Sequence, residues 1–119
     1  MAVEEERIAA MPMLFVYGSL KQGMSEHHYL QDQHFIGPAH SAEKFALLQV
    51  EFDGVAYPMA VESDDGAPLD GEIYKVNPAT LQAIDEYEDY PAVYDRRAFD
   101  FITDAGRTVQ AQMYCGPRR

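Results

Sequence analysis

Four carboxylates crowd into five residues of the chain. Ile84 to Pro91 reads IDEYEDYP, with acids at positions 85, 86, 88 and 89 near the end of a predicted helix. The C-terminal end of a helix disfavours negative charge, and neighbouring carboxylates raise one another's pKa. The rings of Tyr87, Tyr90 and Tyr94 could shield one carboxylate from water, as a general base working near neutral pH requires. The alternative is a helix end whose charges all face water.

A second candidate is the turn that follows the first predicted strand. The apolar run MLFVY ends at Tyr17 and is followed by Gly18, Ser19, Leu20 and Lys21. A glycine there frees the backbone to turn, so that N–H groups can converge on an anion or a carbonyl oxygen. The spacing matches neither a phosphate-binding GxxxxGK[ST] loop nor a GxSxG nucleophile elbow around Ser19. The alternative is an ordinary strand-to-loop turn.

Histidine and cysteine usage does not predict a metal site. His27 and His28 are adjacent, so on a helix they diverge by about 100° and cannot share a metal ion. His34 and His40 are predicted to lie in a polar loop, and we expect all four histidines at the surface. The single cysteine, Cys115, excludes an internal disulfide and has no evident activating base, which favours a structural thiol.

Hydrophobic patterning predicts about six strands and two helices, an α+β domain around a curled antiparallel or mixed sheet. Asp53-Gly54 between two apolar runs indicates a hairpin, and Asn77-Pro78 indicates a helix with an N-cap asparagine and a proline at its first position. Besides the first strand, the expected elements are a short helix over 25–33 capped by Ser25, strands over 45–50, 55–61 and 71–76, a helix from 77 to near Pro91, and strands over 94–102 and 107–114.

Composition predicts one domain and argues against two classes of partner. The 119 residues carry 9 Lys+Arg and 20 Asp+Glu, a net charge of −11 that argues against nucleic acid or a membrane surface as a partner. The longest apolar stretch is far shorter than the ~20 residues of a membrane-spanning helix, and the acidic N-terminus does not resemble a secretory signal. We therefore expect a cytoplasmic protein, with a flexible lead-in over 1–11 and a single domain over 12–119. The oligomeric state is left open.

The same residues resemble the gamma-glutamylcyclotransferase-like family, which includes gamma-glutamylamine cyclotransferases and AIG2-like proteins. FVYGSLK over 15–21, followed by Gly23 and His27-x-x-Leu30, is similar to the family's opening signature. GEIY over 71–74 resembles its G-E-[VI]-Y strand. The segment from Ile84 to Arg96 resembles its L-D-x-[FY]-E-x-x-P-x-x-Y-x-R block. These motifs span the chain from about residue 14 to 114 in the family's order and spacing.

The resemblance implies a compact β-barrel flanked by helices, with a cavity at one end. It implies that backbone N–H groups of the loop Tyr17-Gly18-Ser19-Leu20 bind the glutamyl part of a substrate. It also implies that Glu88, three residues before Pro91, is the catalytic acid and base. Tyr94 would orient Glu88 or the substrate, and Arg96 would pair with carboxylates or contact the substrate. One departure is Glu26, where the family often has asparagine.

The reaction implied by the resemblance is a cofactor-free acyl transfer within one molecule. The α-amine of a gamma-glutamyl amine or amino acid attacks its own side-chain carbonyl, releasing 5-oxoproline and a free amine. The alternatives are related acyl-transfer or isopeptide chemistry in the same cavity, and a member that binds a small molecule without turnover. The glutamate at position 88 favours an enzyme, because a binder of an anionic substrate gains nothing from a buried acid. The leaving amine cannot be identified from the sequence.

Overall fold

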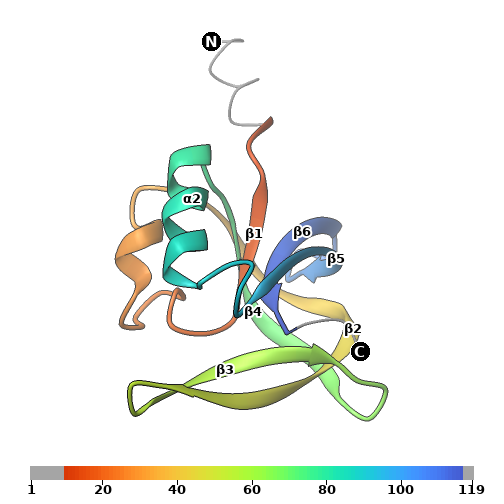
Figure 1. Ribbon diagram of the computed structural model, residues 1–119. Helices are drawn as coiled ribbons and strands as arrows, with labels where there is room; N and C mark the ends of the chain where they lie inside the picture. Colours follow the sequence, from red (N-terminus) through yellow and green to blue (C-terminus); the bar gives the residue numbers. More distant parts are fainter. Residues whose placement is uncertain (1–9, 117–119) are drawn as a thin grey trace.

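A computed structural model describes residues 10–116 as six strands, one α-helix and one 3₁₀-helix (Figure 1). Most of the predicted lead-in, residues 1–9, lies outside the described residues. In chain order the elements are β1 (Met13–Val16), the 3₁₀-helix η1 (His27–Leu30), β2 (His34–Phe52), β3 (Val55–Glu62), β4 (Ala67–Lys75), α2 (Pro78–Tyr87), β5 (Asp95–Thr103) and β6 (Thr108–Cys115).

Five of the strands close into a barrel. The strand order is β2-β4-β1-β6-β5, and pairing of β2 with β5 closes the ring. Only the β1–β6 pairing is parallel among the described strand pairs. β3 pairs with the second half of β2, and the two strands form a long hairpin that projects from the barrel (Figure 1). The prediction of a small mixed barrel flanked by short helices is confirmed.

Strand β2 is much longer than the predicted strand over 45–50, because it begins at His34. Its first part pairs with β4 and β5 and its second part pairs with β3, so the strand bends from the barrel into the hairpin. Register shifts fall between Phe35 and Gly37 and between His40 and Lys44, and Gly37 has a φ of 150°. Such bulges interrupt the two-residue alternation by which a strand is recognised, so this stretch was wrongly predicted to be a loop.

The expected hairpin turn at Asp53-Gly54 is confirmed. Both residues have positive φ, 51° and 78°, as a two-residue turn matched to the twist of its strands requires. Phe52 pairs with Val55 across the turn. The residue pair Asp-Gly therefore sets the register of the β2–β3 hairpin.

The first strand is buried on both faces. Phe15 points into a cluster supplied by all six strands, and its ring stacks on Phe101 with centroids 4.1 Å apart. Leu14 and Val16 face a second cluster, which includes Leu30 and Ile84 from the two helices. A strand that faces the barrel interior on one side and a helical layer on the other must be apolar throughout, which explains the unbroken run MLFV.

Helix α2 begins as predicted and ends earlier than predicted. The Asn77 side chain accepts a hydrogen bond from the Thr80 amide at 2.8 Å, and Pro78 is the first helical residue. The last helical residue is Tyr87, four residues before Pro91. The helix expected over 25–33 is only the single turn η1, whose N-cap is Glu26 without a side-chain hydrogen bond, so the assigned Ser25 cap is wrong.

One glycine of the barrel is required by close packing. A Cβ on Gly71 would lie 2.3 Å from the Val16 carbonyl oxygen and 2.6 Å from the Phe15 ring. Both neighbours belong to β1, which pairs with β4 beside this glycine. The glycine of the GEIY motif therefore lets β4 cross the end of β1, where the site loop begins.

Candidate active site

Glu88 is placed by the way α2 ends. It is the C-cap residue, and Asp89 follows with a φ of 52°, in the left-handed conformation usually taken by glycine. The amide of Tyr90 donates to the Asp85 carbonyl at 2.9 Å, and the amide of Asp89 donates to Glu86 at 3.2 Å. These two bonds form a Schellman motif, which closes the helix and fixes the direction of the Glu88 side chain.

The structure separates the four carboxylates of the acidic segment. Glu86 and Asp89 are exposed, and Asp85 is paired with Arg96. Glu88 is half-buried and lines a cavity. Two of the four acids therefore face water, one is paired with an arginine and one lines the cavity, so the alternative in which all four charges face water does not hold.

The cavity has an empty volume of about 390 Å³ and lies where β1 ends. A second hollow of about 510 Å³ adjoins it and shares Tyr57, Glu88 and Tyr94. Glu88 is thus at the junction of two compartments. The first compartment is lined by Phe15, Val16, Tyr17, Gly18, Ser19, Leu20, Tyr57, Pro58, Glu88, Tyr94 and Tyr114, and the second by Tyr57, Tyr87, Glu88, Asp89, Val93 and Tyr94.

Burial raises the pKa of the Glu88 carboxyl from 4.5 to about 7, with a smaller contribution from the negative charge of Asp89. The tyrosines around Glu88 differ from it in their protonation state at neutral pH. Burial raises the pKa of Tyr17, Tyr94 and Tyr114, and the charge of Glu88 raises each of them further. These phenols therefore stay protonated at neutral pH, whereas Glu88 is divided between its two forms. A carboxylate in that condition can both accept and return a proton.

The Tyr17 hydroxyl joins two strands. It donates to the Tyr114 carbonyl at 2.8 Å and accepts from the Ala60 amide at 3.0 Å. The resemblance places Tyr17 among the substrate-binding residues, and Tyr17 does line the cavity. Its polar atom, however, is already occupied in holding β3 against β6. Any substrate contact of Tyr17 is therefore through its ring or its backbone.

The loop after β1 presents free amides beside the cavity. Within residues 10–116, no hydrogen bond occupies the N–H of Gly18, Ser19 or Leu20, and all three residues line the cavity. Gly18 does not have a positive φ, so the turn itself does not require glycine. A Cβ at this position would lie 3.3 Å from Pro58 Cγ, so the glycine serves a close approach of the loop to β3. The sequence instead suggests that the glycine frees the backbone to turn.

Two tyrosines link the loop, the helix and the hairpin. The Tyr94 hydroxyl donates to the Pro58 carbonyl at 2.8 Å, which directs its proton away from Glu88. Tyr94 therefore anchors the wall of the cavity, and its role in orienting Glu88 stays a prediction. The Ser19 hydroxyl and the Tyr87 hydroxyl lie 3.0 Å apart in a hydrogen bond, which connects the amide loop to the last residue of α2.

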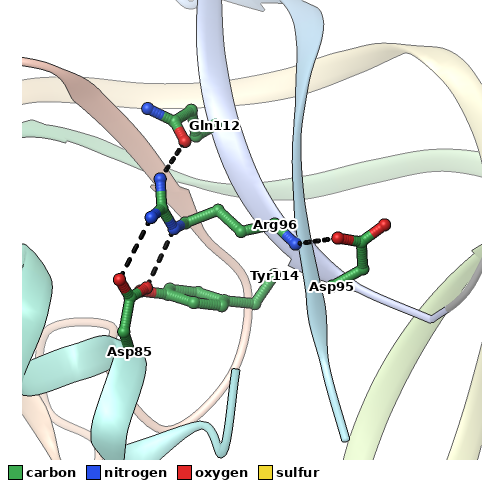
Figure 2. Close-up of polar contacts among 5 residues, drawn as sticks. All are labelled: Asp85, Asp95, Arg96, Gln112 and Tyr114. Carbon is green, nitrogen blue, oxygen red and sulfur yellow. Dashed lines mark hydrogen bonds and ion pairs between the residues drawn. The ribbon is translucent and has the colours of Figure 1, made fainter. Parts of the chain in front are cut away.

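Arg96 is engaged in a network beside the cavity (Figure 2). Its Nε and Nη2 donate to the two oxygens of Asp85 at 2.8 and 3.0 Å, and Nη1 donates to Gln112. The guanidinium carbon lies 4.8 Å from the centre of the Tyr90 ring. Asp85 also accepts from the Tyr114 hydroxyl at 2.5 Å. Of the two roles the sequence leaves open for Arg96, the contacts favour the pairing with carboxylates.

The cysteine agrees with its sequence-based prediction, whereas one histidine does not. Cys115 is fully buried, and burial raises the pKa of its thiol to about 11, as expected of a structural thiol. His27 was predicted to be a surface residue, but it is half-buried and its Nδ1 lies 2.9 Å from the Leu20 carbonyl oxygen. This contact of the His27-x-x-Leu30 motif was missed, because nothing in the sequence aligns a histidine with a carbonyl seven residues earlier. Among the described residues, no group of three or more His, Cys, Asp or Glu side chains could hold a metal ion.

The sequence matches a known protein family over most of its length. Residues 14–119 match the family model described as "Gamma-glutamyl cyclotransferase, AIG2-like". The chain belongs to this family. Its match includes both the amide loop and Glu88. Among the described residues, no helix has the length and apolar character needed to cross a membrane.

Relatives of this gamma-glutamyl cyclotransferase family member cover most of its length. A protein of Methanocaldococcus jannaschii provisionally named a gamma-glutamylcyclotransferase is 35% identical over 108 residues, which are 90% of this chain and 86% of that protein. The gamma-glutamylaminecyclotransferase of Mus musculus is 29% identical, over 87% of this chain and 77% of its own. The crystal structure of an AIG2-like protein from Mus musculus superposes with a TM-score of 0.78 at 28% identity, covering 92% of this chain and 79% of that one.

Proposed function

We propose that this protein is a gamma-glutamyl cyclotransferase that converts a gamma-glutamyl amine or amino acid into 5-oxoproline and a free amine. The α-nitrogen of the substrate forms a bond to its own side-chain carbonyl carbon, and the bond from that carbon to the leaving nitrogen breaks. One proton moves from the attacking nitrogen to the leaving nitrogen. The balance requires no oxidant, reductant or second substrate.

The observation that carries the proposal is that Glu88 and the residues with free amides line the same cavity. Glu88 has a pKa of about 7, so it can take the proton from the attacking nitrogen and return it to the leaving nitrogen. The amides of Ser19 and Leu20 supply donors for the oxygen that becomes negative, or for the substrate carboxylate. The two reacting groups belong to one molecule, so the protein needs chiefly to hold them in attack geometry.

The division of the cavity fits the two products. The compartment next to the amide loop holds the part that becomes 5-oxoproline, and the adjoining hollow takes the leaving amine. Glu88, Tyr57 and Tyr94 belong to both compartments and lie at the boundary where the bond breaks. A carboxylate at that boundary reaches both nitrogens without moving between separate sites. This placement supports one glutamate as acid and base in turn.

The test is direct detection of 5-oxoproline by NMR from a panel of gamma-glutamyl amines and gamma-glutamyl amino acids incubated with the purified protein. Formation of 5-oxoproline together with an equal amount of one free amine supports the proposal and identifies the leaving group. A folded protein that releases no 5-oxoproline from any member of the panel contradicts it. In that case isopeptide formation and binding without turnover remain, and the same spectra report both.

The pH dependence of turnover should follow the ionisation of Glu88. A base must be deprotonated, so kcat/KM should rise with pH through about 7 and fall about tenfold per pH unit well below it. Replacing Asp89 with asparagine removes the neighbouring charge that helps to raise the Glu88 pKa. The rising limb of Asp89→Asn should therefore move to lower pH, by less than a unit because burial, the larger cause, is unchanged.

The measurement is kcat/KM from pH 5.5 to 8.5 for the wild type, Asp89→Asn and Glu86→Gln. Glu86→Gln is a matched control, since it removes an equal charge from an exposed side chain that does not contribute to the Glu88 shift. Any titration of the substrate itself is the same for all three proteins. A limb that moves equally in both variants, or in neither, would contradict the assigned effect of Asp89.

A further inference from the structure

The free amides of the loop depend on three carbonyl oxygens that are held from the other side. The Gly18 carbonyl accepts from the Lys21 amide at 3.1 Å, and the Ser19 carbonyl accepts from the Glu26 amide at 2.8 Å. The Leu20 carbonyl is 2.9 Å from His27 Nδ1. Across a trans peptide, the carbonyl and the N–H of the next residue point in opposite directions. Holding the Gly18 and Ser19 carbonyls therefore turns the N–H groups of Ser19 and Leu20 the other way.

His27 acts at the start of this chain of contacts. Its hydrogen bond to the Leu20 carbonyl fixes the peptide plane between Leu20 and Lys21. The N–H of that same plane belongs to Lys21, which donates to the Gly18 carbonyl. The Gly18 carbonyl in turn shares its plane with the Ser19 N–H. The imidazole thus sets the direction of the Ser19 amide through two peptide planes, which the hydrogen bond from Lys21 to Gly18 links.

His27 is itself held in place by the fold. It is the first residue of η1, next to the Glu26 amide that holds Ser19. Its ring is half-buried, with its centroid 5.9 Å from that of the fully buried Tyr74 ring on β4. A carbonyl oxygen can only accept, so His27 Nδ1 must carry the hydrogen. Of the three donors to the loop carbonyls, His27 alone is a side chain, so it can be removed without altering the backbone.

We propose that His27 is a positioning residue, which holds the amides of Ser19 and Leu20 in the direction that binds the glutamyl part of the substrate. It has no role in proton transfer, which belongs to Glu88. Its loss should weaken substrate binding and leave the proton-transfer step intact. The kinetic consequence rests on the proposed function, whereas the effect on the loop does not.

The expected result for His27→Ala is a KM raised about three- to tenfold, the effect of one side-chain hydrogen bond, with kcat within about threefold of wild type and an unchanged pH limb. His27→Asn should restore most of the loss, because the asparagine Nδ2 takes nearly the place of the imidazole Nδ1. The matched control is His28→Ala. His28 is the next residue of η1, and its ring stacks on Tyr29 with centroids 4.6 Å apart without a hydrogen bond to the described residues.

Two readouts keep this proposal separate from the proposed function. If the wild type releases no 5-oxoproline, the cyclotransferase assignment fails, and His27 is judged by NMR instead. The amide resonances of Ser19 and Leu20 should move in His27→Ala, stay near wild type in His27→Asn and His28→Ala, and show hydrogen on Nδ1 of the neutral His27 ring. Unchanged loop amides in His27→Ala, an unchanged KM in an active enzyme, or hydrogen on Nε2 alone would each overturn the proposal.

Discussion

Replacing Glu88 with glutamine is expected to lower kcat/KM at least about a hundredfold, the smaller end of what a positioned general base contributes. Glutamine keeps the size and shape of the side chain but cannot take a proton from the attacking nitrogen. The loss should appear mainly in kcat, because the amide loop that holds the glutamyl group is untouched. The measurement is initial-rate kinetics with the best substrate of the gamma-glutamyl panel, at pH 8, where the wild-type carboxylate is ionised.

The same substitution should stabilise the fold at alkaline pH. The pKa of Glu88 is raised on folding from 4.5 to about 7, so its charge opposes the folded state. The stability that Glu88 contributes is complete below pH 4.5 and is lost as the pH rises through about 7. Glu88→Gln should therefore unfold like the wild type near pH 4.5 and be more stable at pH 8, by up to about 3 kcal/mol at 1.36 kcal/mol per pKa unit.

Lower activity together with higher stability at pH 8 in Glu88→Gln would identify a carboxylate that serves catalysis and destabilises the fold. Glu86→Gln is the matched control, since Glu86 lies two residues earlier in the same helix end but is exposed. It should retain activity and show no such pH-dependent gain. Equal turnover by the wild type and Glu88→Gln would mean that another group moves the proton. Loss of turnover without the gain in stability at pH 8 would contradict the buried charge.

The α+β class and the place of the acidic segment could be predicted from local chemistry, whereas the closed barrel was predicted from the family resemblance. Asn77-Pro78 starts α2 whatever surrounds it, and Asp53-Gly54 fixes a hairpin by its backbone preferences alone. Once the helix is placed, its end must hold the acidic segment. The resemblance then identifies Glu88 among four acids, and its burial in the cavity agrees with that choice.

Contacts between distant segments could not be predicted in the same way. The Tyr17 hydroxyl meets a carbonyl 97 residues away, and His27 meets the Leu20 carbonyl only because the 21–27 segment folds back. The bend in β2 depends on bulges that no periodicity reveals. In the cases of Tyr17 and His27, a polar residue that looks like a substrate-facing or surface group is used to hold the backbone around the cavity. Such uses become visible only when the partners are in place.

Replacing Arg96 with methionine is expected to destabilise the protein by about 2–4 kcal/mol, because it leaves the charge of Asp85 without its main partner. The two side chains are 16% and 19% exposed, so water replaces the lost contacts poorly. Among the described residues, Tyr114 would then be the only side chain that donates a hydrogen bond to Asp85. The network ties the last turn of α2 to β5 and β6 (Figure 2), so its loss should also loosen the helix end that positions Glu88. Urea unfolding at pH 7.5 measures the change.

The neighbouring arginine provides the matched control. Arg97 also pairs with two carboxylates, Glu62 and Asp95, but these are 41% and 40% exposed and remain hydrated without it. Arg97→Met should therefore cost no more than about 1 kcal/mol. Adding Asp85→Asn to Arg96→Met removes the stranded charge and should recover part of the stability. If Arg96 instead contacts the substrate, Arg96→Met would raise KM and would unfold at the same urea concentration as the wild type. That result would contradict the structural role assigned to Arg96.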